Sequence, residues 1–163
     1  MSKISTRQDK IKKLQTNIKS AQSIFALSGI LTLIYMVRYF ITGNFNFYFS
    51  AYITEFALKA ADENFASTIT LSPGISYAII GIFVLLFIGC CVIATKPQKG
   101  LWFCLIFYVL DFATLITGTA LSVFGPFREE VIIDIIIHVF VILFLIVGVR
   151  SAKKLPEVEK EEA

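Results

Sequence analysis

The fold of this chain is decided by residues 77–94, YAIIGIFVLLFIGCCVIA, a run of apolar and small residues without a single charge. An α-helix needs about 20 mostly apolar residues to cross the hydrocarbon core of a bilayer, and this run with its neighbours meets that length. A transmembrane β-strand would instead alternate apolar and polar residues over about 10 positions. The run therefore predicts a helix that spans a membrane.

The rest of the chain has the same character. Hydrophobic residues make up 56% of its 163 residues and charged residues only 17%, which is too apolar for a soluble domain of this size. Four runs have spanning length, at about residues 21–42, 75–95, 101–124 and 131–149. Short turns separate the last three runs, so the chain is predicted to be an all-α integral membrane protein with an antiparallel four-helix domain over residues 21–149.

The basic residues predict how the spans are oriented. Twelve of the 15 Lys and Arg residues lie in residues 1–20, 96–100 and 150–163, all on one side of the four-span arrangement. The positive-inside rule therefore places both termini in the cytoplasm. The Phe-, Ile- and Lys-rich composition is similar to that of small membrane proteins of low-GC bacteria, and we expect the bacterial plasma membrane as the location.

The two terminal segments differ in pattern. In residues 1–20, Ile11, Leu14 and Ile18 recur at helical spacing among lysines. This pattern predicts a basic amphipathic helix, which either lies on the inner leaflet beside anionic headgroups or extends the first span into the cytoplasm. Residues 150–163 form a charged tail that ends in a Glu-rich stretch, and we expect this tail to be disordered.

The external loop, residues 43–74, is too aromatic for a solvated linker. Phe49, Tyr52 and Phe56 fall at helical spacing, while Glu55 and Lys59 form an i, i+4 pair on another face. We expect residues 47–61 to form a helix that lies in the outer interface or caps the bundle. The aromatic side chains would anchor it at headgroup depth or recognise a partner.

Asp111 is the residue most out of place in a membrane. An ionisable side chain within a span costs on the order of 2.5–3.5 kcal/mol and usually faces protein or water. Asp111 lies ten residues into the third span, which is about 15 Å deep at 1.5 Å per residue. Thr114, Gly118 and Ser122 continue its helical face as a small, polar stripe, and this stripe is expected to face the bundle.

Three further ionisable residues accompany it. Asp134 and His138 lie one turn apart in the fourth span, and Arg38 lies near the outer end of the first. Arg38 either extends its charged group to the headgroups or forms an ion pair with Asp134. In the first case Asp134 is expected to be a carboxylate at the membrane interface. His138 is either an interhelical hydrogen-bonding residue or a proton carrier, and it is the expected partner of Asp111, with Asp134 and Arg38 in a more external layer.

No motif indicates an enzyme. Cys90, Cys91 and Cys104 lie in apolar runs without metal-ligand spacing, and an antiparallel hairpin would place Cys91 and Cys104 at similar depth, where a redox role is the alternative to plain packing. We find no catalytic residues, no metal ligands, no cofactor motif and no nucleic-acid-binding pattern. The expected partners are the lipid bilayer and its anionic cytoplasmic lipids.

Two functions fit these observations. The first is a structural or accessory membrane component, or a protein that protects the membrane as an immunity protein does. In either role the protein would act as a homo-oligomer or as part of a larger membrane complex. The second is a small proton- or cation-coupled transporter in which Asp111 titrates and Arg38, Asp134 and His138 line the outer access path. Four spans make a thin-walled pathway, so the transporter would have to be oligomeric.

Overall fold

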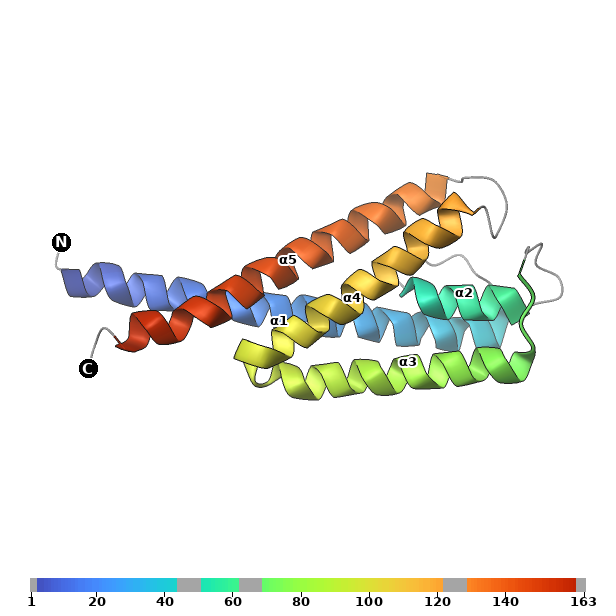
Figure 1. The fold of residues 1–163 in the computed structure, drawn as a ribbon, viewed down its shortest axis with the longest axis horizontal. Coiled ribbons are helices and arrows are strands. Elements are labelled where there is room, and N and C mark those ends of the chain that lie inside the picture. Colours follow the sequence, from blue (N-terminus) through green and yellow to red (C-terminus); the bar gives the residue numbers. More distant parts are fainter. Residues whose placement is uncertain (1–2, 44–50, 62–68, 122–128, 161–163) are drawn as a thin grey trace.

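The computed structural model of the chain describes residues 3–43, 51–61, 69–121 and 129–160. All regular secondary structure in these residues is helical, which confirms the all-α class. The helices are α1 (Lys3–Thr42), α2 (Tyr52–Ala61), α3 (Pro73–Ala94), α4 (Pro97–Ala120) and α5 (Glu129–Lys160). Four of them, α1, α3, α4 and α5, are long and apolar enough to cross a membrane, as the sequence predicts (Figure 1).

Helix starts follow local sequence signals. The side-chain oxygen of Ser72 accepts a hydrogen bond from the N–H of Ile75 at the start of α3, and Pro73 follows in the first helical turn. Pro97 takes the same place in α4. Proline suits this position because its missing N–H would have no partner within the helix.

Both terminal segments continue the long helices. Residues 1–20 were expected either to lie on the membrane or to extend the first span, and the structure shows the extension, because α1 is one helix from Lys3 onward. The expectation that residues 150–163 are disordered is wrong for the described part, since α5 continues to Lys160. The tail finds a partner in α1, where Ile18 packs in the same buried cluster as Ala152.

The paired ends of α1 and α5 extend beyond α3 and α4 (Figure 1). Arg7 of α1 donates through Nε to the backbone carbonyl of Val158 over 3.1 Å, and Asn17 donates to the hydroxyl of Ser151 over 3.2 Å. Where the helices cross, a Cβ at Gly148 would lie 2.3 Å from that of Ala21. The two backbones therefore approach as closely as a glycine allows.

Aromatic rings fill the space between α1, α3 and α4. Phe25 stacks on Phe87 with ring centroids 4.9 Å apart, and Phe83 meets Phe107 at 4.8 Å. Aromatic contacts of this kind contribute about 0.5–1.5 kcal/mol beyond the burial of apolar area. These rings hold α3 against α1 and α4 on the side of the bundle near the α3–α4 turn.

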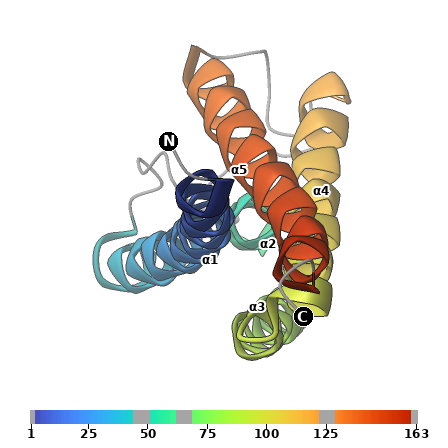
Figure 2. The ribbon, with the colours of Figure 1, turned by 90° about the vertical axis from the view of Figure 1, so that its left-hand side faces the viewer.

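Helix α2 does not lie on the outer rim of the bundle. Seen along the long axis, it lies amid the four long helices (Figure 2), and it packs against α3 and α4. Six of its ten residues are buried, among them Ala57 and Leu58. A helix was predicted here, either in the outer interface or as a cap on the bundle; the structure shows it from Tyr52, buried among the long helices, and the predicted start, Phe47, lies outside the described residues.

Candidate functional site

The start of α2 is held by side chains of two other helices. The backbone N–H of Tyr52 donates to Oδ2 of Asp111 over 3.1 Å, and that of Ile53 donates to Oδ1 over 2.9 Å. The N–H of Ala51 donates to the hydroxyl oxygen of Thr32 in α1 over 2.9 Å. The N–H groups of a first helical turn lack partners within their own helix. Asp111 and Thr32 therefore act as caps supplied by neighbouring helices.

His138 of α5 completes the surroundings of the Asp111 carboxylate. Its Nε2 lies 3.0 Å from Oδ2 of Asp111, and its Nδ1 lies 2.7 Å from the backbone carbonyl oxygen of Asp134. Both side chains are 2% exposed, so water does not screen this pair. The contact confirms the predicted partnership of Asp111 with His138.

The geometry places one proton between these two side chains. A carbonyl oxygen only accepts hydrogen bonds, so Nδ1 of His138 carries a hydrogen and its Nε2 faces the carboxylate. The shared proton then lies either on Nε2, which gives an imidazolium–carboxylate pair, or on Oδ2 of Asp111. Two backbone N–H donors and the positive end of the α2 dipole stabilise a negative carboxylate. We therefore assign the pair as imidazolium and carboxylate.

Aromatic rings from α4 enclose the imidazole. The ring centroid of Tyr108 lies 5.2 Å from that of His138, and Phe112 is stacked on it at 5.8 Å. Aromatic faces attract a cation within about 6 Å. Tyr108 and Phe112 precede and follow Asp111 on the same helix, so α4 supplies both the carboxylate and the walls around its partner.

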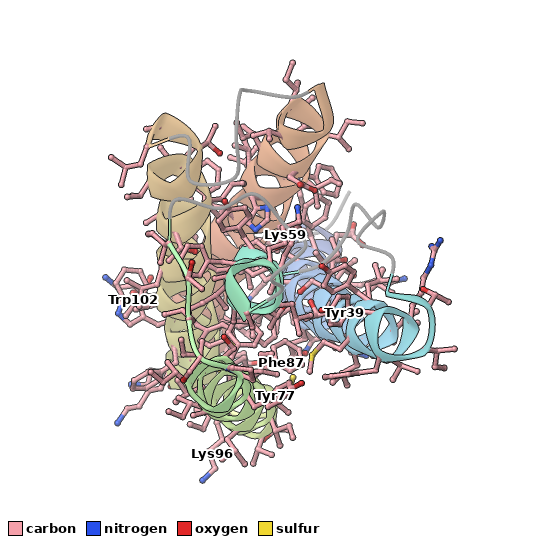
Figure 3. All side chains as sticks on the ribbon, turned by 90° about the vertical axis from the view of Figure 1, so that its right-hand side faces the viewer. Tyr39, Lys59, Tyr77, Phe87, Lys96 and Trp102 are labelled. Atoms are coloured by element: carbon pink, nitrogen blue, oxygen red, sulfur yellow. The ribbon has the colours of Figure 1, made fainter. Side chains whose placement is uncertain are left out.

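A second pair of ionisable residues lies on α2. Glu55 and Lys59 form an ion pair one turn apart, and their side chains are only 11% and 16% exposed. Figure 3 shows Lys59 with the long helices around it. Sequence reasoning found the pair, on another face than the aromatic residues, but did not predict its burial. The signal it missed is Ala57 and Ala60, since small residues allow a helix to pack closely against its neighbours.

The predicted small, polar stripe of α4 faces the bundle at Gly118. A Cβ at Gly118 would lie 2.5 Å from the hydroxyl oxygen of Tyr52, so the absence of a side chain lets α2 pack against α4. Thr114 donates to the backbone carbonyl of Asp111 over 2.6 Å and does not bind its carboxylate. Ser122 lies outside the described residues.

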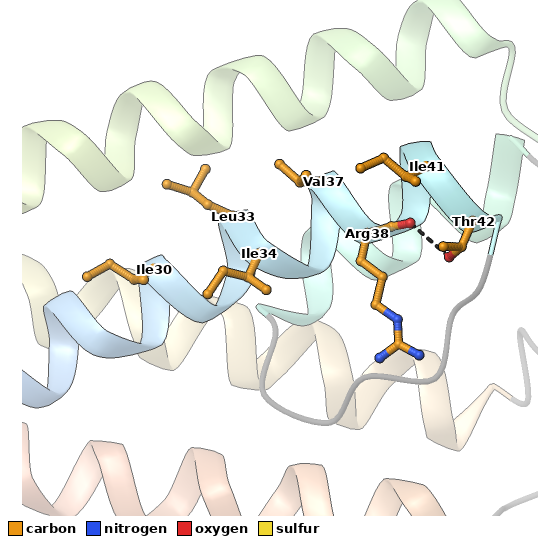
Figure 4. Close-up of a pocket in the computed structure, with 7 residues that line it drawn as sticks. All are labelled: Ile30, Leu33, Ile34, Val37, Arg38, Ile41 and Thr42. Atoms are coloured by element: carbon orange, nitrogen blue, oxygen red, sulfur yellow. Dashed lines mark hydrogen bonds between the residues drawn. The ribbon is translucent and has the colours of Figure 1, made fainter.

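Arg38 does not join the Asp111 site. It is exposed on α1 and lines a shallow apolar hollow with Ile34 and Val37 (Figure 4). The predicted ion pair with Asp134 is not among the interactions that the structure shows for the described part of the chain. Asp134 is half-buried one turn from His138, so the expected outer layer is built from Asp134 without Arg38.

An apolar groove of about 680 Å³ reaches the site from the side. It runs between α2, α3 and α4, and Ile53 and Asp111 are part of its lining. The polar residues of its lining are Asp111, Thr114 and Thr117. The other lining residues are aliphatic residues, phenylalanines and one glycine. The groove thus passes beside the site, whose carboxylate is itself almost fully buried.

The three cysteines are free thiols away from this site. Cys104 is buried and its Sγ lies 3.5 Å from the backbone carbonyl oxygen of Cys90, to which it donates, while Cys91 is half-buried. Within the described residues, no three His, Cys, Asp or Glu side chains are grouped so that they could hold a metal ion. The Asp111 site itself consists of a carboxylate, an imidazole and a helix terminus.

Comparison of this chain with protein-family models, with curated proteins and with solved structures finds no match.

Proposed function

We propose that this protein is an integral protein of a bacterial plasma membrane, with α1, α3, α4 and α5 crossing antiparallel and both termini in the cytoplasm. The apolar surface of these helices supports insertion, because large side chains such as Ile41, Leu85 and Val92 are exposed along them. The distribution of Lys and Arg supports the orientation. In this arrangement α2 is a half-helix that begins near the middle of the membrane, level with Asp111.

We further propose that the bundle is a small proton-coupled transporter whose proton site is the pair of Asp111 and His138. The observation that carries this proposal is the start of α2 on a buried carboxylate. Transporters build their sites near the bilayer midplane from discontinuous helices whose N-termini face anionic groups. Non-helical backbone at membrane depth is tolerated where it is buried in protein or lines a cavity.

In this mechanism the proton between Nε2 of His138 and Oδ2 of Asp111 is the coupling ion. When it leaves, the imidazole is neutral and its Nε2 lone pair faces the carboxylate, so the contact between His138 and Asp111 is lost. When it returns, the contact forms again. The two backbone N–H groups of α2 hold the carboxylate in place during both steps, and α5 is the element that moves.

Glu55, Lys59 and Asp134 would form the outer part of the proton path. They lie beyond His138 and Asp111 toward the end of the bundle where α3 begins, and all three are at least half-buried. Four spans make a thin wall around such a path, so we propose that the protein works as a homo-oligomer. Anionic lipids would bind the basic cytoplasmic ends of α1 and α5.

Proteoliposomes that contain a pH-sensitive dye test the proposal. Pools of candidate cations, anions and neutral solutes are added outside under an imposed pH gradient, and a coupled solute will dissipate the gradient in wild-type vesicles. Asp111→Asn and His138→Gln should abolish this response, whereas Arg38→Gln, on the exposed face of α1, should preserve it. If no pool changes the internal pH, or if Asp111→Asn responds like the wild type, proton coupling is wrong.

The paired ends of α1 and α5 support a second candidate, an accessory component of a larger membrane complex. This pair extends beyond α3 and α4 and carries exposed Lys12, Lys13, Lys153 and Lys154 (Figure 1). A projecting helical pair needs no chemistry from Asp111. If Asp111→Asn folds and supports the same cellular phenotype, while charge reversal of these lysines abolishes it, the accessory function is the correct one.

A further inference from the structure

A pocket of about 400 Å³ lies between the first turns of α4 and the part of α5 that continues past its apolar run. It is lined by Gln98, Trp102, Val149, Ala152, Lys153 and Pro156. Pockets that bind small ligands usually have volumes of about 300–1,000 Å³. This pocket is therefore large enough for a small polar group held between two helices.

The pocket crosses the boundary between apolar and charged sequence on both helices. Val149 is the last residue of the apolar run of α5, and Lys153 lies about one turn beyond it. On α4, Gln98 precedes the apolar run that starts at Leu101, whereas Trp102 lies within that run. Tryptophan is enriched at the interface between membrane and water. In the proposed orientation the pocket therefore lies at headgroup depth in the inner leaflet.

Three polar side chains line the pocket, and all three can donate hydrogen bonds. Lys153 carries an ammonium group, Trp102 an indole N–H and Gln98 an amide. Within the described residues, none of the three takes part in another side-chain hydrogen bond or ion pair, and no carboxylate belongs to the lining. The lining therefore presents mainly donors, which suit an anion.

The charges within two residues of this lining are mostly positive. The basic residues beside it, on both helices, are Lys96, Lys99, Arg150 and Lys154. The one acidic residue is Glu157, and the described part of the chain shows no ion pair between Glu157 and Lys153. With Lys153 included, five basic groups and one acidic group lie in or beside the lining, so the pocket attracts an anion.

We propose that this pocket binds the headgroup of one anionic phospholipid of the inner leaflet. The lipid phosphate accepts hydrogen bonds from the side chains of Lys153, Gln98 and Trp102, and the acyl chains lie beside the apolar runs of α4 and α5. The bound lipid thus bridges these two helices at their cytoplasmic ends. This inference rests on the proposed membrane orientation, and it gives the attraction of anionic lipids to the basic ends one defined site.

Trp102 is the only tryptophan of the chain, so its fluorescence reports from the pocket alone. Brominated acyl chains quench a tryptophan that they contact. The full chain is reconstituted in mixtures of phosphatidylglycerol and phosphatidylcholine with bromine on one lipid at a time, and the quenching gives the relative affinity of the two lipids at Trp102. We expect phosphatidylglycerol to be preferred about fivefold, the factor that corresponds to about 1 kcal/mol for one lysine beside an anionic headgroup.

Two adjacent lysines of α5 provide a matched pair of variants. Lys153 lines the pocket and Lys154 does not, although both are exposed. Lys153→Gln should remove most of the preference for phosphatidylglycerol, whereas Lys154→Gln should leave it unchanged. A diffuse attraction depends on the total charge of the surface and would fall equally in both variants. Neither lysine forms an ion pair in the described part of the chain, so both variants should fold.

Each of three results would overturn the inference: equal quenching by the two brominated lipids, equal loss of preference in the two variants, or loss of the preference when excess inorganic phosphate is added at constant ionic strength. The second would identify a diffuse basic surface, and the third a site for soluble phosphate. A reporter fused after Ala163 tests the orientation separately. If it reports a cytoplasmic location while Trp102 shows no lipid preference, the orientation is correct and only the lipid site is wrong.

Discussion

Replacing Asp111 by Leu should destabilise the protein more than any other single change to its polar groups. The variant leaves three buried groups without partners: the N–H groups of Tyr52 and Ile53 and Nε2 of His138. Each buried polar group that loses its hydrogen-bond partner lowers the free energy of unfolding by about 1–3 kcal/mol. Relaxation of α2 reduces the sum, and we expect about 3–5 kcal/mol, the usual cost of removing one partner from a buried pair.

Asp111→Asn should cost less, about 1–3 kcal/mol, because the amide retains most of these bonds. Its oxygen accepts from the N–H of Ile53, and its NH₂ group donates to Nε2 of a neutral His138. The N–H of Tyr52 then faces a donor and loses its partner. The expected order of stability is therefore wild type, Asn and then Leu.

Thr114→Val is the matched control for both variants. The hydroxyl of Thr114 donates only to the backbone carbonyl of Asp111 one turn earlier, so its removal leaves no buried donor behind. We expect a change below about 1 kcal/mol for this variant. The control lies on the same helix, one turn from the site, and it tests whether any polar loss near Asp111 has the same effect.

Unfolding by titration with sodium dodecyl sulfate measures these differences, and hydrogen exchange locates them. The amide hydrogens of residues 51–53 should exchange faster in Asp111→Leu, while those in the middle of α3 should change little. If Asp111→Leu is no less stable than Thr114→Val, or if the amides of residues 51–53 keep their protection, Asp111 does not hold the start of α2.

Three further changes test the same arrangement. Thr32→Val leaves the backbone N–H of Ala51, directly before α2, without an acceptor and should cost about 1–3 kcal/mol in the same unfolding titration. Gly118→Ala adds a Cβ against the tyrosine ring at the start of α2 and should destabilise the bundle, whereas Gly81→Ala, whose Cβ would meet nothing within 4 Å, should be neutral or stabilising. A reporter fused after Ala163 should report a cytoplasmic location, and one inserted in residues 62–67 should report an external location. Termini on opposite sides of the membrane would contradict the four-span arrangement.

The sequence predicted that His138 is the partner of Asp111, but it did not predict the distance between the two side chains. Counting residues from the expected outer ends of the spans placed the two about 9 Å apart along the membrane normal at 1.5 Å per residue. In the structure they are in direct contact at 3.0 Å. Residue counting assumes spans perpendicular to the membrane, whereas α4 and α5 lie oblique to α1 and α3 (Figure 1).

The position of Glu55 and Lys59 was not predictable in the same way. A pair of opposite charges at i, i+4 reads as an exposed face, because most such pairs lie at surfaces. Only the packing of α2 among the long helices buries them. The alanines of α2 and Gly118 of α4 indicate that another helix can pack closely against them. Small residues do not, however, identify which helix packs there.

The sequence by itself determined the four long apolar helices and the residues that need a polar partner within them. Both follow from the cost of exposing hydrocarbon to water and of burying a charge, and these costs depend on composition over about 20 residues. The tertiary structure decided that α2 starts on Asp111, that the tail pairs with α1 and that Arg38 lies apart. Those outcomes depend on which backbones can approach each other, and that is set by side-chain shape across helices distant in sequence.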